Sequence, residues 1–446
     1  MDRSGVGMAH ETISGPLGTI AGGDGVEAAY YVIPFDQNGV CTGPVTQADC
    51  VRSAGAATDV FLFSHGWNND WAGATRRYEE FIDAYVAARR GAWSPPDRDY
   101  RPLAVGVFWP SAALVAPWER APRIAGTVTA EPDLTPDVLE LGQALAPEQA
   151  RRFYDLVDRE QINVDQAAEL ATLLGPVLGA DTDELGQRGT SVDDLLRVWS
   201  HLRSDEPRAA TSEVGGFVEE RAQPGGPLAA GGGWLDPRGL IRLATVLLMK
   251  DRAGRVGGHG VADLLTALCA APGQPRIHLV GHSYGAKVVL SALCAPPDGA
   301  VRVDSVLLLQ PAVSCFCFAD SVPGTGRPGG YHEAPARSRE PVLTTFSRFD
   351  VPLTSLFHLA VRRSSDLGEA VIAGLPPSRY AALGGYGPQG RDAETLVTPP
   401  ARPPELYPLA TTAARLVAIQ ADEIIHGHGD VTNPATAWAL LSQVRS

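Results

Sequence analysis

The segment RIHLVGHSYGAKVVLSALC, residues 276–294, changes character at one serine. Residues 276–280 are mostly apolar and predict a short strand, and residues 286–293 repeat apolar side chains at the spacing of an amphipathic helix. Ser283 stands at the junction, with Gly281 and Gly285 two positions away on either side. A sharp strand-to-helix turn strains the backbone of its central residue, and only small neighbours fit around it. The context therefore indicates a nucleophilic serine, although G-x-S-x-G alone is weak in a chain with 48 glycines.

The helix that follows Ser283 predicts how negative charge would be stabilised beside it. Amide groups at a helix N-terminus attract an oxyanion, and the amide of Tyr284 is the expected first donor. A second donor is expected in SHGWNND, residues 64–70, which directly follows an apolar strand-like run. Gly66 permits a sharp turn there, which makes the amide of Trp67 the best second donor and that of Gly66 the next. His65 is interpreted as a structural residue that holds this loop by hydrogen bonds.

Strand-like and helix-like segments alternate over most of the chain. Almost wholly apolar runs are typical of strands buried on both faces of a parallel sheet. The predicted strands are residues 27–34, 59–64, 102–109, 276–280, 305–310, 341–347 and 414–421. The predicted helices between and after them are residues 71–90, 238–249, 259–270, 284–294 and one that follows the last loop. The alternation predicts an α/β fold with a mainly parallel central sheet and flanking helices.

Residues 112–235 break this alternation. They show no clear strand and four helix-like pieces, within residues 135–145, 146–160, 164–178 and 191–203. We therefore expect an inserted helical cap or lid at 112–235, between an N-terminal part of the core at 1–111 and a C-terminal part at 236–446.

The two motifs together resemble the α/β-hydrolase superfamily of serine esterases and lipases. More narrowly, HGWNND and VFWPS, residues 107–111, resemble bacterial hydrolases with H-G-Y-N-N and W-P-S signatures. The resemblance covers about residues 55–110 and 260–440. It implies an α/β-hydrolase fold and a catalytic triad in the chain order Ser, acid, His, with an oxyanion hole and no metal or organic cofactor.

The acid implied by that order should follow a strand after Ser283. Asp350 comes directly after residues 341–347, at the usual carboxyl end of the penultimate strand, and is the preferred acid. Asp320 is the alternative, and Asp366 is a further acidic residue in this part of the chain. Asp304 precedes its strand and is therefore expected at the amino end of the strand, away from the site.

The base should lie in the loop after the last strand. His428 stands between Gly427 and Gly429 in HGHGD and is the preferred base, with His426 as the alternative. His358 lies in a helix-like segment and is expected to be a packed histidine. A competing interpretation is that His426, His428 and Asp430 form an H-x-H-x-D zinc motif. Val431 stands where that motif continues with histidine, and no later histidine follows, so we expect no metal.

Composition excludes some partners. A net charge of −14 argues against a nucleic-acid surface, and the longest apolar run is interrupted by Gln310 and Pro311, so no integral membrane segment is expected. The first 15 residues lack the apolar segment of a signal peptide, which predicts a cytoplasmic protein, with a processed secreted form as the alternative. Cys41 and Cys50 could bridge in an oxidising compartment. The sequence does not indicate an oligomeric state.

The expected function is hydrolysis of a carboxylic ester, with a small-molecule ester or acyl compound as substrate. Ser283 would be the nucleophile, His428 the base and Asp350 the orienting acid. Two alternatives remain open: an amidase or peptidase that uses the same residues, and a non-catalytic binding protein with this fold.

Overall fold

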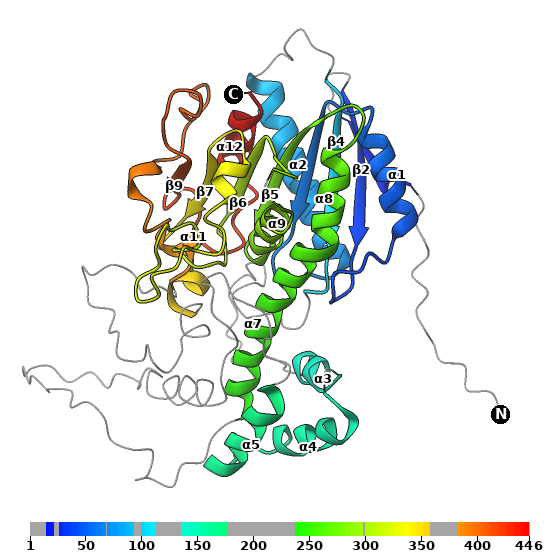
Figure 1. The fold of residues 1–446 in the computed structure, drawn as a ribbon, viewed down its shortest axis with the longest axis vertical. Helices are drawn as coiled ribbons and strands as arrows, with labels where there is room; N and C mark the ends of the chain where they lie inside the picture. The colour runs from blue at the N-terminus through cyan, green and yellow to red at the C-terminus, as the bar shows by residue number, and fades with distance from the viewer. Residues whose placement is uncertain are drawn as a thin grey trace, which may run out of the picture.

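A nine-stranded sheet runs through the centre of the protein (Figure 1). The computed structural model describes residues 15–21, 26–67, 69–92, 100–111, 135–143, 145–175, 237–297, 299–356 and 381–445. The strand order is β1-β2-β4-β3-β5-β6-β7-β9-β8. The strands are β1 (Gly18–Ala21), β2 (Glu27–Pro34), β3 (Asp59–Ser64), β4 (Pro102–Phe108), β5 (Arg276–His282), β6 (Ser305–Leu309), β7 (Val342–Phe346), β8 (Thr395–Thr398) and β9 (Leu416–Gln420). Only β1 pairs antiparallel with its neighbour, so the sheet is mixed but mostly parallel.

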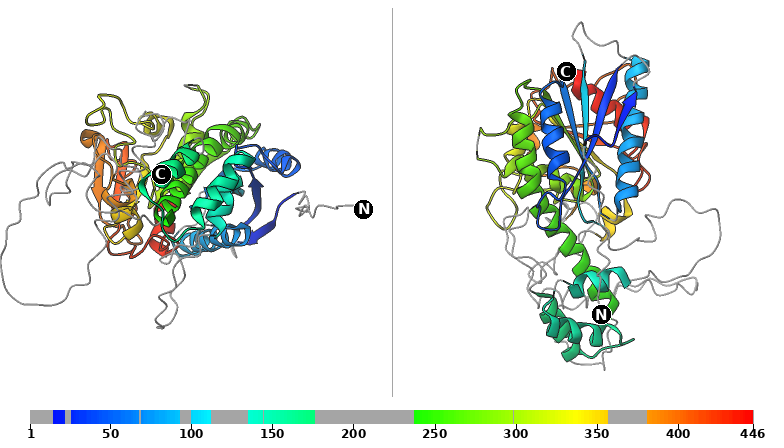
Figure 2. Two further views of the ribbon diagram at one scale, coloured as in Figure 1. Left: turned by 90° about the horizontal axis from the view of Figure 1, so that it is seen from below. Right: turned by 90° about the vertical axis from the view of Figure 1, so that its right-hand side faces the viewer.

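Helices cover both faces of the sheet, which gives three layers (Figure 2). Alternate residues of β3 belong to different apolar clusters: Leu62 packs in the cluster with α9, and Phe63 packs in the cluster with α2 and α12. This division follows from the period of two in a strand, where successive side chains point to opposite faces. One face is covered by α1 (Pro44–Ala54), α7 (Pro237–Val256), α8 (Ala262–Cys269) and α9 (Tyr284–Cys294), and the other by α2 (Trp71–Ala92) and α12 (Pro434–Arg445).

Three helices between β4 and α7 in the chain lie beyond the end of the sheet to which the arrow of β2 points (Figure 1). They are α3 (Thr135–Gln143), α4 (Pro147–Val157) and α5 (Val164–Leu174). Their buried residues, such as Phe153 and Leu170, belong to the same apolar cluster as Leu240 and Ile241 at the start of α7. The described part of residues 112–235 is thus helical, as expected. The predicted helix at 191–203 lies outside the described residues.

The remaining regular elements are short. They are a π-helical turn η2 (Gly257–Val261), the 3-10 turns η3 (Ala334–Arg337) and η6 (Asp392–Glu394), a π-helical turn η4 (Pro352–Leu356) and α11 (Leu383–Tyr386).

The predicted strands are confirmed to within a few residues, and the differences have physical causes. The strands β1 and β8, the helix α1 and short elements such as α11 were missed. The strands β1 and β8 have four residues each; β1 is mostly exposed and β8 is mostly half-buried, so neither has the long apolar run that signals a buried strand. The helix α1 begins with a proline directly after Gly43 and has few apolar residues, so it gives little helical signal in the sequence. Helices were expected at 238–249 and 259–270, and both are present. The gap expected between them is wrong, because α7, η2 and α8 follow one another without a break through the glycines at 257–258.

The chain reverses its direction across the sheet at β3. It passes from β3 through α2 to β4 on one side, and β5 later pairs with β3 on the other side, with Ser64 opposite Gly281. In open parallel sheets, the crevice at the carboxyl ends of the strands where the order reverses is where ligands bind. The residues that follow β3 and β5 therefore meet at this position.

Among the described helices, none is long and apolar enough to cross a membrane. Cys41 and Cys50 are both free thiols.

Candidate active site

Ser283 joins β5 to α9 with a left-handed backbone. Its φ is 55° and its ψ is −124°, a conformation that is strained for a residue with a side chain. Its amide donates to the carbonyl of Leu309 at 3.1 Å, and its own carbonyl accepts the amides of Ala286 and Ala312, both at 3.1 Å. The turn is therefore held from β6 as well as from its own helix.

The two elbow glycines are required by close contacts. A Cβ at Gly281 would lie 2.6 Å from the Cα of Ala286. A Cβ at Gly285 would overlap the carbonyl oxygens of Ser64 and His65, because α9 begins directly against the end of β3. The predicted small neighbours of Ser283 are thus explained by the packing of the turn against β3 and α9.

The structure brings Ser283, His428 and Asp350 into one hydrogen-bonded chain, from three separate loops. His428 Nε2 lies 2.8 Å from Ser283 Oγ, and His428 Nδ1 lies 2.8 Å from Asp350 Oδ2. Because an ionised carboxylate only accepts hydrogen bonds, Nδ1 carries the proton and Nε2 is free to accept from the serine hydroxyl. The side chains of Ser283 and Asp350 are buried, and His428 is almost so.

The alternative acids and bases do not join this chain. Asp304 lies at the amino ends of the strands, where its carboxylate accepts the amide of Ile277. Asp320 is exposed beside Arg391. His426 is exposed, and its backbone amide donates to Asp430. His358 and Asp366 lie outside the described residues.

The peptide group between Gly66 and Trp67 is oriented by two side chains. The carbonyl oxygen of Gly66 accepts from His65 Nδ1 at 2.8 Å and from Asn69 Nδ2 at 3.1 Å. Asn69 Nδ2 also donates to the carbonyl of Trp67 at 3.0 Å. In a trans peptide the C=O and N–H point in opposite directions, so the amide of Trp67 points away from these donors. Gly66 also lies against Ser283, since a Cβ on Gly66 would be 2.7 Å from the serine Cβ.

The HGWNND and VFWPS motifs form a single hydrogen-bonded unit. The Trp109 amide donates to His65 Nε2 at 3.3 Å, and the Trp109 indole donates to the His65 carbonyl at 3.1 Å, with the two rings stacked. Ser111 Oγ accepts the Asn69 amide at 3.1 Å. His65 is thus a loop-fixing residue, as expected. Burial, together with the nearby Arg77, lowers the pKa of His65 to about 4 and keeps the ring neutral.

Tyr284 begins α9, so its amide is at the helix N-terminus directly after Ser283. Its ring packs near that of Trp67, with 6.3 Å between ring centroids, and its hydroxyl donates to the carbonyl of Val246 on α7. The residues expected to supply oxyanion donors therefore lie next to one another and beside Ser283.

Two residues at this site were missed by the sequence analysis. His282 Nε2 donates to the backbone carbonyl of His428 at 2.9 Å and so ties β5 to the histidine loop. Burial, with the charges of His428 and Arg77, lowers the pKa of His282 well below its usual value. Gln310 donates to Asp350 at 2.9 Å. The position of His282 directly before Ser283 could have indicated a role at the site. Nothing in the sequence indicated that Gln310 contacts Asp350.

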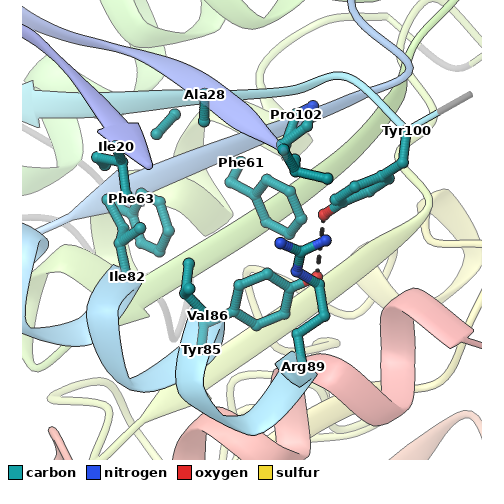
Figure 3. A pocket seen from close by; sticks show the side chains of 12 residues that line it. Ile20, Ala28, Phe61, Phe63, Ile82, Tyr85, Val86, Arg89, Tyr100 and Pro102 are labelled. Atoms are coloured by element: carbon teal, nitrogen blue, oxygen red, sulfur yellow. Dashed lines mark hydrogen bonds between the residues drawn. The ribbon is translucent and has the colours of Figure 1, made fainter. Parts of the chain in front are cut away.

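The part of the chain that the structure describes shows no metal cluster at this site, and a cavity in it lies elsewhere. Among the described residues, no group of three His, Cys, Asp or Glu side chains could hold a metal ion. A cavity of about 30 Å³ lies instead against the face of the sheet that α2 covers. Figure 3 shows Arg89 and the hydroxyls of Tyr85 and Tyr100 close together at one end of it. None of Ser283, His428 and Asp350 lines it.

Comparisons of the chain with protein-family profiles, with curated proteins and with solved structures found no match. The site is therefore interpreted from its own geometry.

Gly285→Ala should destabilise the protein strongly, because the added methyl group meets backbone carbonyls that cannot rotate away. We expect a loss of about 2–4 kcal/mol in the free energy of unfolding, measured by urea denaturation. Gly258→Ala is the matched control, since nothing lies within 4 Å of a Cβ at that helical position. Equal stability of the two variants would contradict the close packing of α9 on β3.

Stability should fall with acidification because His65 is buried in its neutral form. An unfolded histidine takes up a proton near pH 6.5, whereas folded His65 resists protonation until about pH 4. The free energy of unfolding should therefore decrease by up to about 3 kcal/mol between these pH values on account of this residue. His65→Asn should reduce the pH dependence measured by urea denaturation, and His259→Asn is the control for loss of an exposed imidazole. An unchanged pH dependence in His65→Asn would count against the neutral His65.

Proposed function

We propose that this protein is a serine hydrolase of the α/β-hydrolase kind that cleaves carboxylic esters. The observation that carries the proposal is the chain from Ser283 Oγ through His428 to Asp350, with 2.8 Å at both hydrogen bonds. The serine at its end occupies a left-handed turn between a parallel strand and a helix. These are the parts of a nucleophile elbow with an attached base and acid.

The position of the three residues in the fold supports this assignment. Ser283 follows the central strand β5, Asp350 follows β7, and His428 follows β9. All three strands are parallel, so the loops after them meet at one edge of the sheet. The order Ser, Asp, His along the chain is that of α/β-hydrolases. An α/β-hydrolase core therefore accounts for the sheet order and for the site together.

The reaction would begin with attack of Ser283 Oγ on the ester carbonyl carbon. His428 Nε2 accepts the hydroxyl proton as the new C–O bond forms, and Asp350 stabilises the resulting imidazolium through Nδ1–H. The carbonyl oxygen becomes an oxyanion, for which the amides of Trp67 and Tyr284 are the proposed donors. When the tetrahedral intermediate collapses, the bond to the alcohol oxygen breaks and His428 returns its proton to the leaving alcohol.

Hydrolysis of the acyl-enzyme would repeat these steps with water. His428 Nε2 accepts a proton from a water molecule while the water oxygen attacks the acyl carbon. The proton then passes to Ser283 Oγ as the carboxylic acid product is released. The chain's own side chains and amides suffice for every proton and electron-pair transfer. We propose that α3, α4 and α5 belong to a cap beside this site, which suits a small-molecule ester or acyl compound with an apolar part.

The proposed nucleophile can be tested by labelling with a fluorophosphonate probe and by hydrolysis of p-nitrophenyl esters. The unsubstituted protein should be labelled on Ser283 and should hydrolyse short or medium acyl esters. Ser283→Ala should lose labelling and at least about 10³-fold in kcat, because the attacking oxygen is removed.

Ser338→Ala is the matched control, since Ser338 is also buried and its hydroxyl donates to the backbone carbonyl of Glu340, away from His428. Faster cleavage of p-nitroanilides than of esters would favour the amidase alternative. An unlabelled protein whose hydrolysis rate does not change in Ser283→Ala would refute the enzyme proposal.

Asn69→Asp should weaken the proposed oxyanion hole without touching Ser283, His428 or Asp350. The carboxylate has the shape of the amide but cannot donate to the carbonyls of Gly66 and Trp67, so the Trp67 amide loses its orientation. We expect kcat to fall by about 10–100-fold. The affinity for an aryl boronic acid, which forms a tetrahedral serine adduct, should fall by a similar factor.

Asn163→Asp is the control, because this capping position at the start of α5 needs only an oxygen acceptor. Full affinity of Asn69→Asp for the boronic acid would exclude this role of Asn69.

A further inference from the structure

The carboxylate of Asp350 has a second hydrogen-bond partner besides His428. Its Oδ2 accepts both His428 Nδ1 at 2.8 Å and Gln310 Nε2 at 2.9 Å, and its Oδ1 accepts the Leu353 amide at 3.1 Å. Asp350 and Gln310 are both fully buried. A buried carboxylate requires such donors, because no water replaces them. Gln310 therefore supplies one of three donors that hold this carboxylate.

Gln310 has only one orientation that satisfies its surroundings. Its Oε1 accepts the Thr345 hydroxyl at 2.9 Å, and its Nε2 donates to Asp350 and also to the carbonyl of Gly384 at 2.9 Å. Reversing the amide would place Nε2 against a hydroxyl and Oε1 against two acceptors, so the assignment follows from the network. Every polar atom of this side chain has a partner.

The backbone of Gln310 is also constrained. Its φ of 44° lies in the left-handed region, which is unfavourable for a residue with a side chain, and its amide donates to Thr345 Oγ1 at 2.9 Å. Strained non-glycine residues persist where the surrounding structure holds them, and they cluster at functional sites. Thr345 lies in β7, five residues before Asp350, so Gln310 joins the end of β6 to the end of β7.

We propose that Gln310 is a positioning residue that holds the Asp350 carboxylate with Oδ2 facing His428 Nδ1. The inference rests on the proposed function for its effect on catalysis. Gln310 would act through Asp350 and would not touch the substrate. Its neutral amide donates to the carboxylate without adding a positive charge, so among the described residues the imidazolium of His428 would be the cation that the carboxylate stabilises directly.

Gln310→Leu removes the donor while keeping a similar volume. The carboxylate then loses one of its three donors and can rotate away from His428, and small misplacements at a catalytic group can cost about 100-fold in rate. We expect kcat for a p-nitrophenyl ester to fall by about 10–100-fold with KM little changed. The acidic limb of the pH–rate profile, which reports the base, should move.

Gln443→Leu is a matched control for loss of a buried glutamine. Gln443 Nε2 also donates to two acceptors, the carbonyls of Val306 and Pro341, but these lie at the amino ends of β6 and β7. This variant should lose stability without a change in kcat or in the pH–rate profile. If the two variants lose kcat equally, the effect of Gln310 is structural and the proposal is overturned.

A second variant covers the case in which Gln310→Leu does not fold. Gln310→Glu has the same shape as the native side chain and donates to Asp350 only while its carboxyl holds a proton. The rate of this variant relative to the unsubstituted protein should therefore decrease as the pH rises. A ratio near one at all pH values would overturn the proposal.

A spectroscopic measurement separates this inference from the proposed function. The Nδ1 proton of His428, shared with a carboxylate, should give a far-downfield resonance in the proton NMR spectrum of the full chain. Gln310→Leu should shift or abolish that signal, and Gln443→Leu should leave it in place. If the protein is neither labelled nor active but shows these changes in the resonance, the ester hydrolase is refuted and the role of Gln310 stands. If the resonance is unchanged in Gln310→Leu, the role of Gln310 is overturned.

Discussion

The left-handed backbone at Ser283 is the constraint on which the rest of the site depends. An L-residue enters this conformation only when its surroundings compensate for the strain. Here the compensation comes from hydrogen bonds to Leu309 and Ala312 and from the close approach of α9 to β3 at Gly285. That approach also fixes where the loop after β3 must lie. The turn at Ser283 and the loop that begins at His65 therefore pack directly against each other, and the position of one determines the position of the other.

The other half of the site is held by polar contacts between strand ends. His282 ties β5 to the carbonyl of His428, and Gln310 ties β6 to Asp350. Both contacts join residues that follow different strands at the carboxyl edge of the sheet. The hydrogen-bonded chain from Ser283 to Asp350 is therefore supported from strands on both sides. A side chain held from two directions loses little further freedom when a substrate arrives, which is what pre-organised catalysis requires.

The histidines of the protein illustrate how position changes chemistry. His65 and His282 are kept neutral by burial and by nearby positive charge, so each can donate from one nitrogen while it fixes a loop. His428 has a carboxylate on one nitrogen and a hydroxyl on the other. Only this arrangement lets an imidazole accept a proton and be stabilised when it becomes charged. Within one site, His65 and His282 thus hold loops by hydrogen bonds, whereas His428 links a hydroxyl to a carboxylate.

Most of the strands, the elbow and the identities of Ser283, Asp350 and His428 could be predicted from the sequence. Buried strands are continuous apolar runs, and the elbow is a local pattern of a strand, small residues and a helix, so neighbouring residues contain the information. The edge strands β1 and β8 could not be found, because they have only four residues each and none of these residues is fully buried, so they leave no long apolar run in the sequence. Only the tertiary structure decided that Asp350 and not Asp320 meets His428, that Asn69 and His65 donate to the carbonyl of Gly66, and that Gln310 donates to the Asp350 carboxylate. These contacts join residues that are distant in the chain, and their partners are chosen by the register of the sheet, which no local pattern records.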